Sequence, residues 1–287
     1  DGATRLLRKV PNNVYLLNLT GMSYQGLSQH NNSIKLFKEA LKYGPNNTAV
    51  LNNYANSIKA IGKLELSQEL YEKTLKLDPG YVNAYNNYAN LKTLVNDYQG
   101  AIRLYTKALE LLKSKQNPQK TSIVGILFSL AVAYQSENKI EETKKIIKEI
   151  FAIEPFHVGA NKLISSIIKY SKNDQESLEH IKKMEELNDI IDMSDYENKV
   201  DISYALGKSY EDLKDFKKAF YYLSIANNLK YNEKGSNLEA EKKAINNIIK
   251  TFEGIDFNNL NTASSDKKII FILGMPRSGT TLTEQII

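Results

Sequence analysis

The stretch Asn52-Asn53-Tyr54-Ala55-Asn56 recurs 34 residues later as Asn86-Asn87-Tyr88-Ala89-Asn90. The prolines Pro11, Pro45 and Pro79 keep the same interval. Self-similarity at a fixed period of this length is typical of stacked copies of one structural unit, each of which buries its apolar face against its neighbours. We therefore expect a repeat protein rather than a chain folded around a single core.

Two further sets of residues recur in this register and indicate what each unit contains. Small residues occupy one position in the first half of each unit and aromatic residues one position in the second half: Gly21, Ala55 and Ala89, then Phe37, Tyr71 and Tyr105. This pattern predicts two antiparallel helices per unit, because the small residue lets the second helix approach and the aromatic fills the space beside it. Each proline then ends the second helix, since it lacks an N–H and restricts the residue before it.

These landmarks closely resemble the tetratricopeptide repeat, a helix–turn–helix unit of 34 residues. The resemblance implies a mainly α-helical fold, an α-solenoid of about six helix pairs, within residues 1–253. The units are expected near residues 14–47, 48–81, 82–115, 124–157, 158–190 and 200–233, and a charged connecting helix follows them. The fifth unit keeps the fewest landmarks. In this family the first helices line a concave groove, so the resemblance implies a protein or peptide partner.

Four asparagines of the recurring stretch are candidates for contacting that partner: Asn53, Asn56, Asn87 and Asn90. They lie on the first helix of their unit, away from the core positions Tyr54 and Tyr88. An amide offers donors and acceptors, so it can pair with a peptide backbone whatever the peptide sequence. Asparagine ladders hold extended peptides in some repeat-bearing glycosyltransferases, and the resemblance suggests the same here. Alternatively, a lysine- and asparagine-rich composition places them there by chance.

The overall composition argues against several classes of function. The chain has 287 residues, and its 38 basic and 33 acidic side chains are spread along it, so a nucleic-acid partner is not indicated. The absence of cysteine excludes disulfides and thiolate metal sites, and the three histidines form no metal motif. No signal peptide or membrane span is apparent, so the default location is cytoplasmic. The chain begins at Asp1 and stops within an apolar stretch, and we expect both ends to be cut from a longer protein.

The character of the sequence changes at residue 254. A polar linker is expected over residues 254–267, followed by the apolar run 268–273, which has the length of a strand buried on both faces. A glycine-bounded loop, residues 274–281, and an apolar helix start come next. Strand, loop and helix in this order are the context of a phosphate-binding loop, in which the N–H groups of a helix N-terminus bind an anion.

The loop departs from the nucleotide triphosphatase pattern in an informative way. Thr280 stands where that pattern has its lysine, and a cation appears instead at Arg277. Pro276-Arg277-Ser278-Gly279-Thr280-Thr281 behind an apolar strand resembles the 5′-phosphosulfate loop of sulfotransferases, which use 3′-phosphoadenosine 5′-phosphosulfate (PAPS). With the repeats in front, the chain resembles the repeat-containing bacterial sulfotransferases, which are related to the protein-tyrosine sulfotransferases. Residues 268–287 would then be the truncated start of an α/β, P-loop-like catalytic domain.

This resemblance implies roles for the loop residues. Arg277 would be catalytic, binding the 5′-phosphosulfate and stabilising the charge that builds up as the sulfuryl group leaves. The co-substrate PAPS would be held by Pro276, Arg277, Ser278, Gly279, Thr280 and Thr281, and no metal is needed. The catalytic base and the 3′-phosphate site would lie downstream of Ile287, so this fragment alone is expected to be inactive.

Three hypotheses for function stay open from the sequence. In the first, the parent protein transfers a sulfuryl group from PAPS to an acceptor hydroxyl, such as a protein tyrosine, that the repeats recruit. In the second, the repeats are a protein–protein interaction scaffold and the phosphate loop is vestigial. The third, a P-loop kinase or triphosphatase, is disfavoured by the missing lysine. The acceptor is open as well, since a carbohydrate, a lipid or a small molecule would also fit the first hypothesis.

Overall fold

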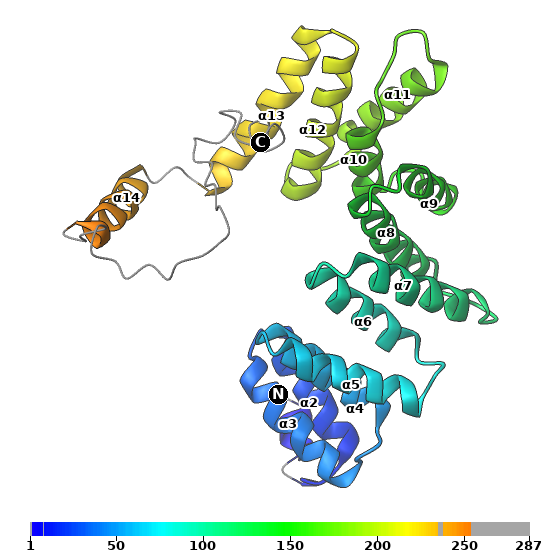
Figure 1. Cartoon of the computed structure of the whole chain (residues 1–287), viewed down its shortest axis with the longest axis vertical. Helices are drawn as coiled ribbons and strands as arrows, with labels where there is room; N and C mark the ends of the chain where they lie inside the picture. The colour runs from blue at the N-terminus through cyan, green and yellow to red at the C-terminus, as the bar shows by residue number, and fades with distance from the viewer. Residues whose placement is uncertain (1, 8, 235–237, 254–287) are drawn as a thin grey trace, which may run out of the picture. The chain divides into compact units, whose positions relative to one another are not determined.

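The computed structural model describes residues 2–7, 9–234 and 238–253, and all regular structure within these ranges is α-helical (Figure 1). Helices α1 to α13 belong to one compact unit, and α14 (Leu238–Phe252) belongs to another. The first unit comprises α1 (Gly2–Leu7), α2 (Val14–Gly26), α3 (His30–Tyr43), α4 (Thr48–Ala60), α5 (Leu64–Leu77), α6 (Val82–Leu94), α7 (Tyr98–Lys113), α8 (Lys120–Ser136), α9 (Ile140–Ile153), α10 (Val158–Ile167), α11 (Gln175–Ile190), α12 (Tyr196–Asp212) and α13 (Phe216–Lys234).

The expected helical repeat fold is confirmed. Helices α2 to α13 follow one another as six pairs, with the even-numbered helix first in each pair. Five of the pairs pack as regular hairpins, whereas in the fifth, which we still call the fifth hairpin, α10 packs mainly against α12. The short helix α1 in front of them was not predicted. The linker at 254–267 and the strand expected at 268–273 lie outside the described residues. None of the described helices has the length and apolar character required to cross a membrane.

The turn inside each regular hairpin repeats the same backbone conformation. Ser28, Gly62 and Asn96 lie in the first three turns and have φ of 57°, 79° and 60°. Asn138 and Lys214 adopt the same left-handed conformation in the fourth and sixth turns. Only glycine reaches this region without steric cost. The described residues show no such turn in the fifth hairpin, where the longer segment 168–174 joins the two helices.

Close approach of the two helices within a hairpin is clearest in the first unit. Gly21 on α2 faces the ring of Phe37 on α3, which is completely buried. A Cβ atom at position 21 would lie 2.5 Å from Cε1 of Phe37, a distance that real Cβ atoms do not tolerate. The small residue that recurs on the first helices is therefore a steric requirement at this position.

Neighbouring hairpins stack through aromatic and aliphatic side chains. Tyr71 on α5 packs face to face with Tyr88 on α6, with ring centroids 5.7 Å apart. The largest apolar cluster begins at Val82 and extends to Leu163, so it spans the third and fourth hairpins and reaches into the fifth. Each hairpin thus completes its core only against the next, as expected for a stacked array.

A partly buried polar network joins α10 and α11 of the fifth hairpin. His180 on α11 stacks on the ring of Tyr170, and its Nδ1 lies 2.7 Å from the Tyr170 hydroxyl. Its Nε2 lies 2.9 Å from Oδ1 of Asn161 on α10, and the Asn161 amide donates to the carbonyl of His157. These partners place the His180 proton on Nε2. Burial, with a smaller effect of Lys183, lowers the pKa of His180 to about 4.

Replacing Gly21 by alanine should destabilise the protein, although alanine is the better helix former by about 1 kcal/mol. The new methyl group must displace a fully buried ring, and overpacking of this kind costs about 1–3 kcal/mol. Gly125 on α8 is the matched control, since a Cβ there meets nothing within 4 Å. In urea titrations followed by circular dichroism, Gly21→Ala should lower the midpoint and Gly125→Ala should raise or preserve it. A midpoint raised by Gly21→Ala would contradict this packing.

The His180 network should make stability depend on pH in a defined window. The unfolded histidine has a pKa near 6.5 and the folded one a pKa of about 4, so the unfolded chain binds more protons between these values. Stability should therefore fall as the pH drops from about 6.5 towards 4, by up to about 3 kcal/mol for this group.

Denaturant midpoints measured between pH 7 and pH 4.5 test this effect. His180→Gln should be less stable at pH 7 and should show a smaller loss on acidification than the parent chain. His30→Gln, which leaves the network intact, should lose as much stability on acidification as the parent chain does. An equal loss in the His180→Gln variant would show that carboxylates, and not His180, cause the acid sensitivity.

Candidate functional site

A continuous line of side-chain amides crosses the first helices of the first three hairpins. Asn87 on α6 donates from Nδ2 to Oδ1 of Asn52 on α4, at 3.0 Å. Asn52 donates to Oδ1 of Asn53 at 3.2 Å, and Asn53 donates to Oδ1 of Asn18 on α2 at 3.1 Å. We call Asn18, Asn52, Asn53 and Asn87 the amide line. In each bond the acceptor lies one place further along the line from the third hairpin, so the amide orientations are mutually consistent.

The amide line leaves hydrogen-bonding capacity at the accessible positions. Asn52 is only 3% exposed and acts as the buried connector, whereas Asn53 and Asn87 are half-buried. An amide has two N–H donors and an oxygen with two lone pairs. The side chain of Asn53 uses one donor and one lone pair within the line, so one of each is left. The backbone oxygen of Asn53 also accepts from Nε2 of Gln25 on α2, which further fixes the contact between the first two hairpins.

The other two predicted asparagines are anchored within their own hairpins. The Tyr71 hydroxyl donates to Oδ1 of Asn56, and the Tyr105 hydroxyl donates to Oδ1 of Asn90. Burial raises the pKa of both phenols, so both stay protonated and act as donors. With its oxygen occupied in this way, each asparagine directs its amide NH2 away from the tyrosine. These side chains are therefore oriented donors.

The sequence-based prediction named two of the four residues of the amide line and missed the residue that connects them. Asn53 and Asn87 meet through Asn52, which was quoted in the recurring stretch but not proposed as a site residue. Asn18 was also missed. The signal was present, because positions 18, 52 and 86 are all asparagine at the 34-residue interval.

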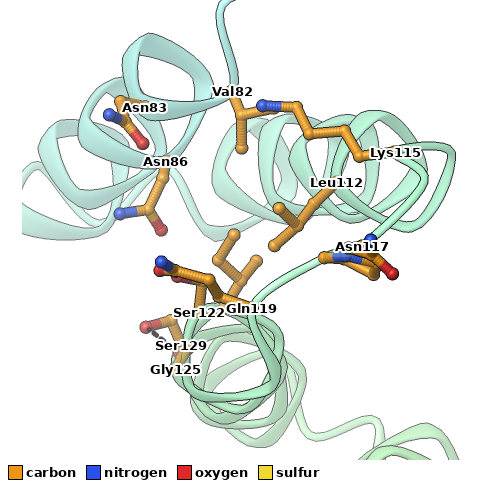
Figure 2. Close-up of a pocket in the computed structure, with 12 residues that line it drawn as sticks. Val82, Asn83, Asn86, Leu112, Lys115, Asn117, Gln119, Ser122, Gly125 and Ser129 are labelled. Atoms are coloured by element: carbon orange, nitrogen blue, oxygen red, sulfur yellow. Dashed lines mark hydrogen bonds between the residues drawn. The ribbon is translucent and has the colours of Figure 1, made fainter.

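A pocket of about 480 Å³ lies between α6, the end of α7 and the start of α8 (Figure 2). Its floor is apolar and includes Val82, Leu112 and Ile126, each less than 10% exposed. Its rim carries amides, hydroxyls and one cation: Asn83, Asn86, Asn117, Gln119, Ser122, Ser129 and Lys115. Figure 2 shows Asn86 and Gln119 directed from opposite sides towards the space between α6 and α8. The volume falls within the roughly 300–1,000 Å³ of pockets that hold small ligands.

The predicted phosphate-loop residues lie outside the described residues. These are Pro276, Arg277, Ser278, Gly279, Thr280 and Thr281, and their roles stay predictions. Within the described ranges, no cluster of three or more His, Asp or Glu side chains could hold a metal ion.

Comparison with known proteins identifies the repeat. Residues 70–103 match the tetratricopeptide repeat family, and this stretch takes in the second half of α5, all of α6 and the start of α7. An uncharacterised protein of Aquifex aeolicus (strain VF5) is 30% identical over 171 residues, which is 57% of this chain. The chain spans only 21% of the length of that relative. The chain therefore contains a tetratricopeptide repeat.

Solved structures share the arrangement of the helices. PilF of Pseudomonas aeruginosa matches 81% of this chain and 97% of its own, with a TM-score of 0.59 and 14% identity. YrrB, described as a TPR protein with an unusual peptide-binding site, matches 72% of this chain and 97% of its own, with a TM-score of 0.50 and 17% identity. At these identities the likeness shows the fold alone, which is that of a tetratricopeptide array.

Proposed function

We propose that the helical array is a protein–protein interaction scaffold that binds an extended segment of a partner along α2, α4 and α6. The amide line is the observation that carries this proposal. It fixes Asn53 and Asn87 by hydrogen bonds between hairpins and leaves each with capacity for a ligand. Groups that are already oriented lose little conformational entropy when a ligand binds.

The chemistry of these side chains favours a peptide backbone as the ligand. A backbone in extended conformation presents alternating N–H and C=O groups, and amides satisfy both kinds. Asn56 and Asn90 add oriented N–H donors next to the line. Such contacts are independent of the partner's sequence, so they provide affinity and leave selectivity to other groups. A peptide-binding site in YrrB, a protein of the same fold, is compatible with this use of the array.

For the parent protein we further propose PAPS-dependent sulfuryl transfer, with the array recruiting the acceptor. The support is the sequence of residues 268–281: an apolar run, a glycine-bounded loop, and Arg277 in place of the triphosphatase lysine. In this proposal Arg277 stabilises the charge on the leaving phosphate oxygen, and Ser278 to Thr281 hold the 5′-phosphate. An acceptor hydroxyl on a bound protein, such as a tyrosine, would be the substrate.

Binding to the array can be measured without knowledge of the natural partner. The probe is a fluorescein-labelled nonapeptide library with all residues except cysteine at each position, titrated with the 287-residue chain and followed by fluorescence polarisation. Changing Asn53, Asn56, Asn87 and Asn90 together to alanine should weaken binding at least tenfold. This corresponds to the loss of two or more hydrogen bonds of about 1 kcal/mol each.

Two controls separate binding from folding. Asn228→Ala removes an exposed asparagine on α13 and should bind as the parent does. The double variant Asn56→Ala, Asn90→Ala leaves the amide line intact, so it should stay stacked and still lose affinity. Circular dichroism verifies that each variant is helical. Unchanged library affinity in both asparagine variants would refute the proposed binding surface.

The transfer reaction requires the full-length parent protein. With labelled PAPS and a tyrosine-containing acceptor, Arg277→Ala should reduce transfer by at least a hundredfold, as when one transition-state donor is lost. The matched control is Arg103→Ala on α7, an exposed arginine of the array, which should leave transfer unchanged. Full activity in the Arg277→Ala variant would remove the role assigned to this residue.

A further inference from the structure

The pocket between α6 and α8 is built by a local departure from the repeat. The first helices α2, α4 and α6 have 13 residues each, whereas α8 has 17, an addition of about one turn. The extra turn of α8 and the segment 114–119 in front of it are absent from the preceding units. They supply Lys115, Gln119 and Ser122 to the pocket. Stacking in the preceding hairpins is achieved without this insertion.

The amide line stops where this pocket opens. Between the first and second hairpins, and again between the second and third, the asparagine at position 53 or 87 donates to the asparagine 35 residues before it. Asn86 has the same repeat position as the acceptors Asn18 and Asn52, and the next first helix places Ser129 near it. Within the described residues no hydrogen bond joins Asn86 to Ser129, whose hydroxyl donates to the carbonyl of Gly125. Asn86 and Ser129 instead line the pocket.

The charge of the lining favours one kind of side chain. Among the residues that the structure describes, no aspartate or glutamate lines the pocket, and Lys115 is the only charged one that does. The rim amides can donate to an anion, and the buried floor packs against methylene groups. The Ser122 and Ser129 hydroxyls already donate, to Oε1 of Gln119 and to the carbonyl of Gly125. A basic side chain would meet a like charge without an acidic partner, so it is disfavoured.

We propose that this pocket selects an acidic side chain, glutamate or aspartate, of the peptide whose backbone lies on the amide line. The inference rests on the proposed peptide binding and adds specificity to it. Lys115 provides the countercharge, while Asn86 and Gln119 donate to the carboxylate from opposite walls. The insertion before α8 thus adds selectivity for the peptide's sequence to an array that otherwise binds only the peptide's backbone.

Three fluorescein-labelled nonapeptide libraries test the proposal. They have glutamate, glutamine or lysine at the central position and only uncharged residues other than cysteine elsewhere. The 287-residue chain should bind the glutamate library about two- to fivefold more tightly than the glutamine library, as expected for a partly exposed ion pair. The lysine library should bind most weakly. Glutamate and glutamine have nearly the same shape, so their difference reports charge.

Charge reversal in the pocket should abolish the preference. Lys115→Glu should bind the lysine library best, whereas Lys148→Glu, the same change on an exposed part of α9, should keep the parent's order. Equal affinity of the parent for the glutamate and glutamine libraries would overturn the pocket's role and leave peptide binding standing. A glutamate preference that survives Lys115→Glu would overturn it as well. Failure of all three libraries to bind would contradict the proposed peptide binding itself.

Discussion

Stacking of hairpins in a 34-residue register is the constraint on which the side-chain arrangement of the first helices depends. The register places a small residue opposite a buried ring, as with Gly21 and Phe37, and so sets how closely two helices approach. It also brings the same residue type to the same point on successive helices. For asparagine the consequence is self-pairing, because an amide is complementary to another amide. The bonds that tie the hairpins together therefore also orient the groups on their surface.

The two proposed binding features lie in different parts of the array: the peptide-backbone site where the repeat is regular, and the side-chain pocket where an insertion interrupts it. Along α2, α4 and α6 the repeat is regular, and the surface offers the same hydrogen bonds at each step, which suits a peptide backbone. At α8 the insertion contributes to a pocket in which Lys115 is the one cation among the described lining residues. In this account the asparagines of the regular units provide affinity for any peptide backbone, and the pocket at α8 provides selectivity for a side chain. The fifth hairpin is irregular in another way, since a partly buried histidine network joins its two helices.

The repeat fold could be predicted from the sequence because packing constrains it strongly. A recurring small residue and a recurring aromatic allow few arrangements other than a helical hairpin. The candidate site was only partly predictable. The two bonds of the amide line that connect neighbouring hairpins join residues 35 apart, one more than the period, and this offset depends on how neighbouring helices cross. For that reason Asn52 was missed as the connector. The pocket could not be foreseen either, since the residues around Pro118 show an insertion but not the space it encloses.

The side-chain amide signals of the asparagines in 15N NMR spectra test the central claim most directly. The account predicts that the NH2 groups of Asn52, Asn53 and Asn87 exchange slowly with solvent and have dispersed shifts in the free chain. Addition of a peptide library should perturb the signals of Asn53 and Asn87 and leave that of the exposed Asn228 unchanged. Fast exchange of all three amides, or peptide-induced shifts confined to other parts of the chain, would contradict it.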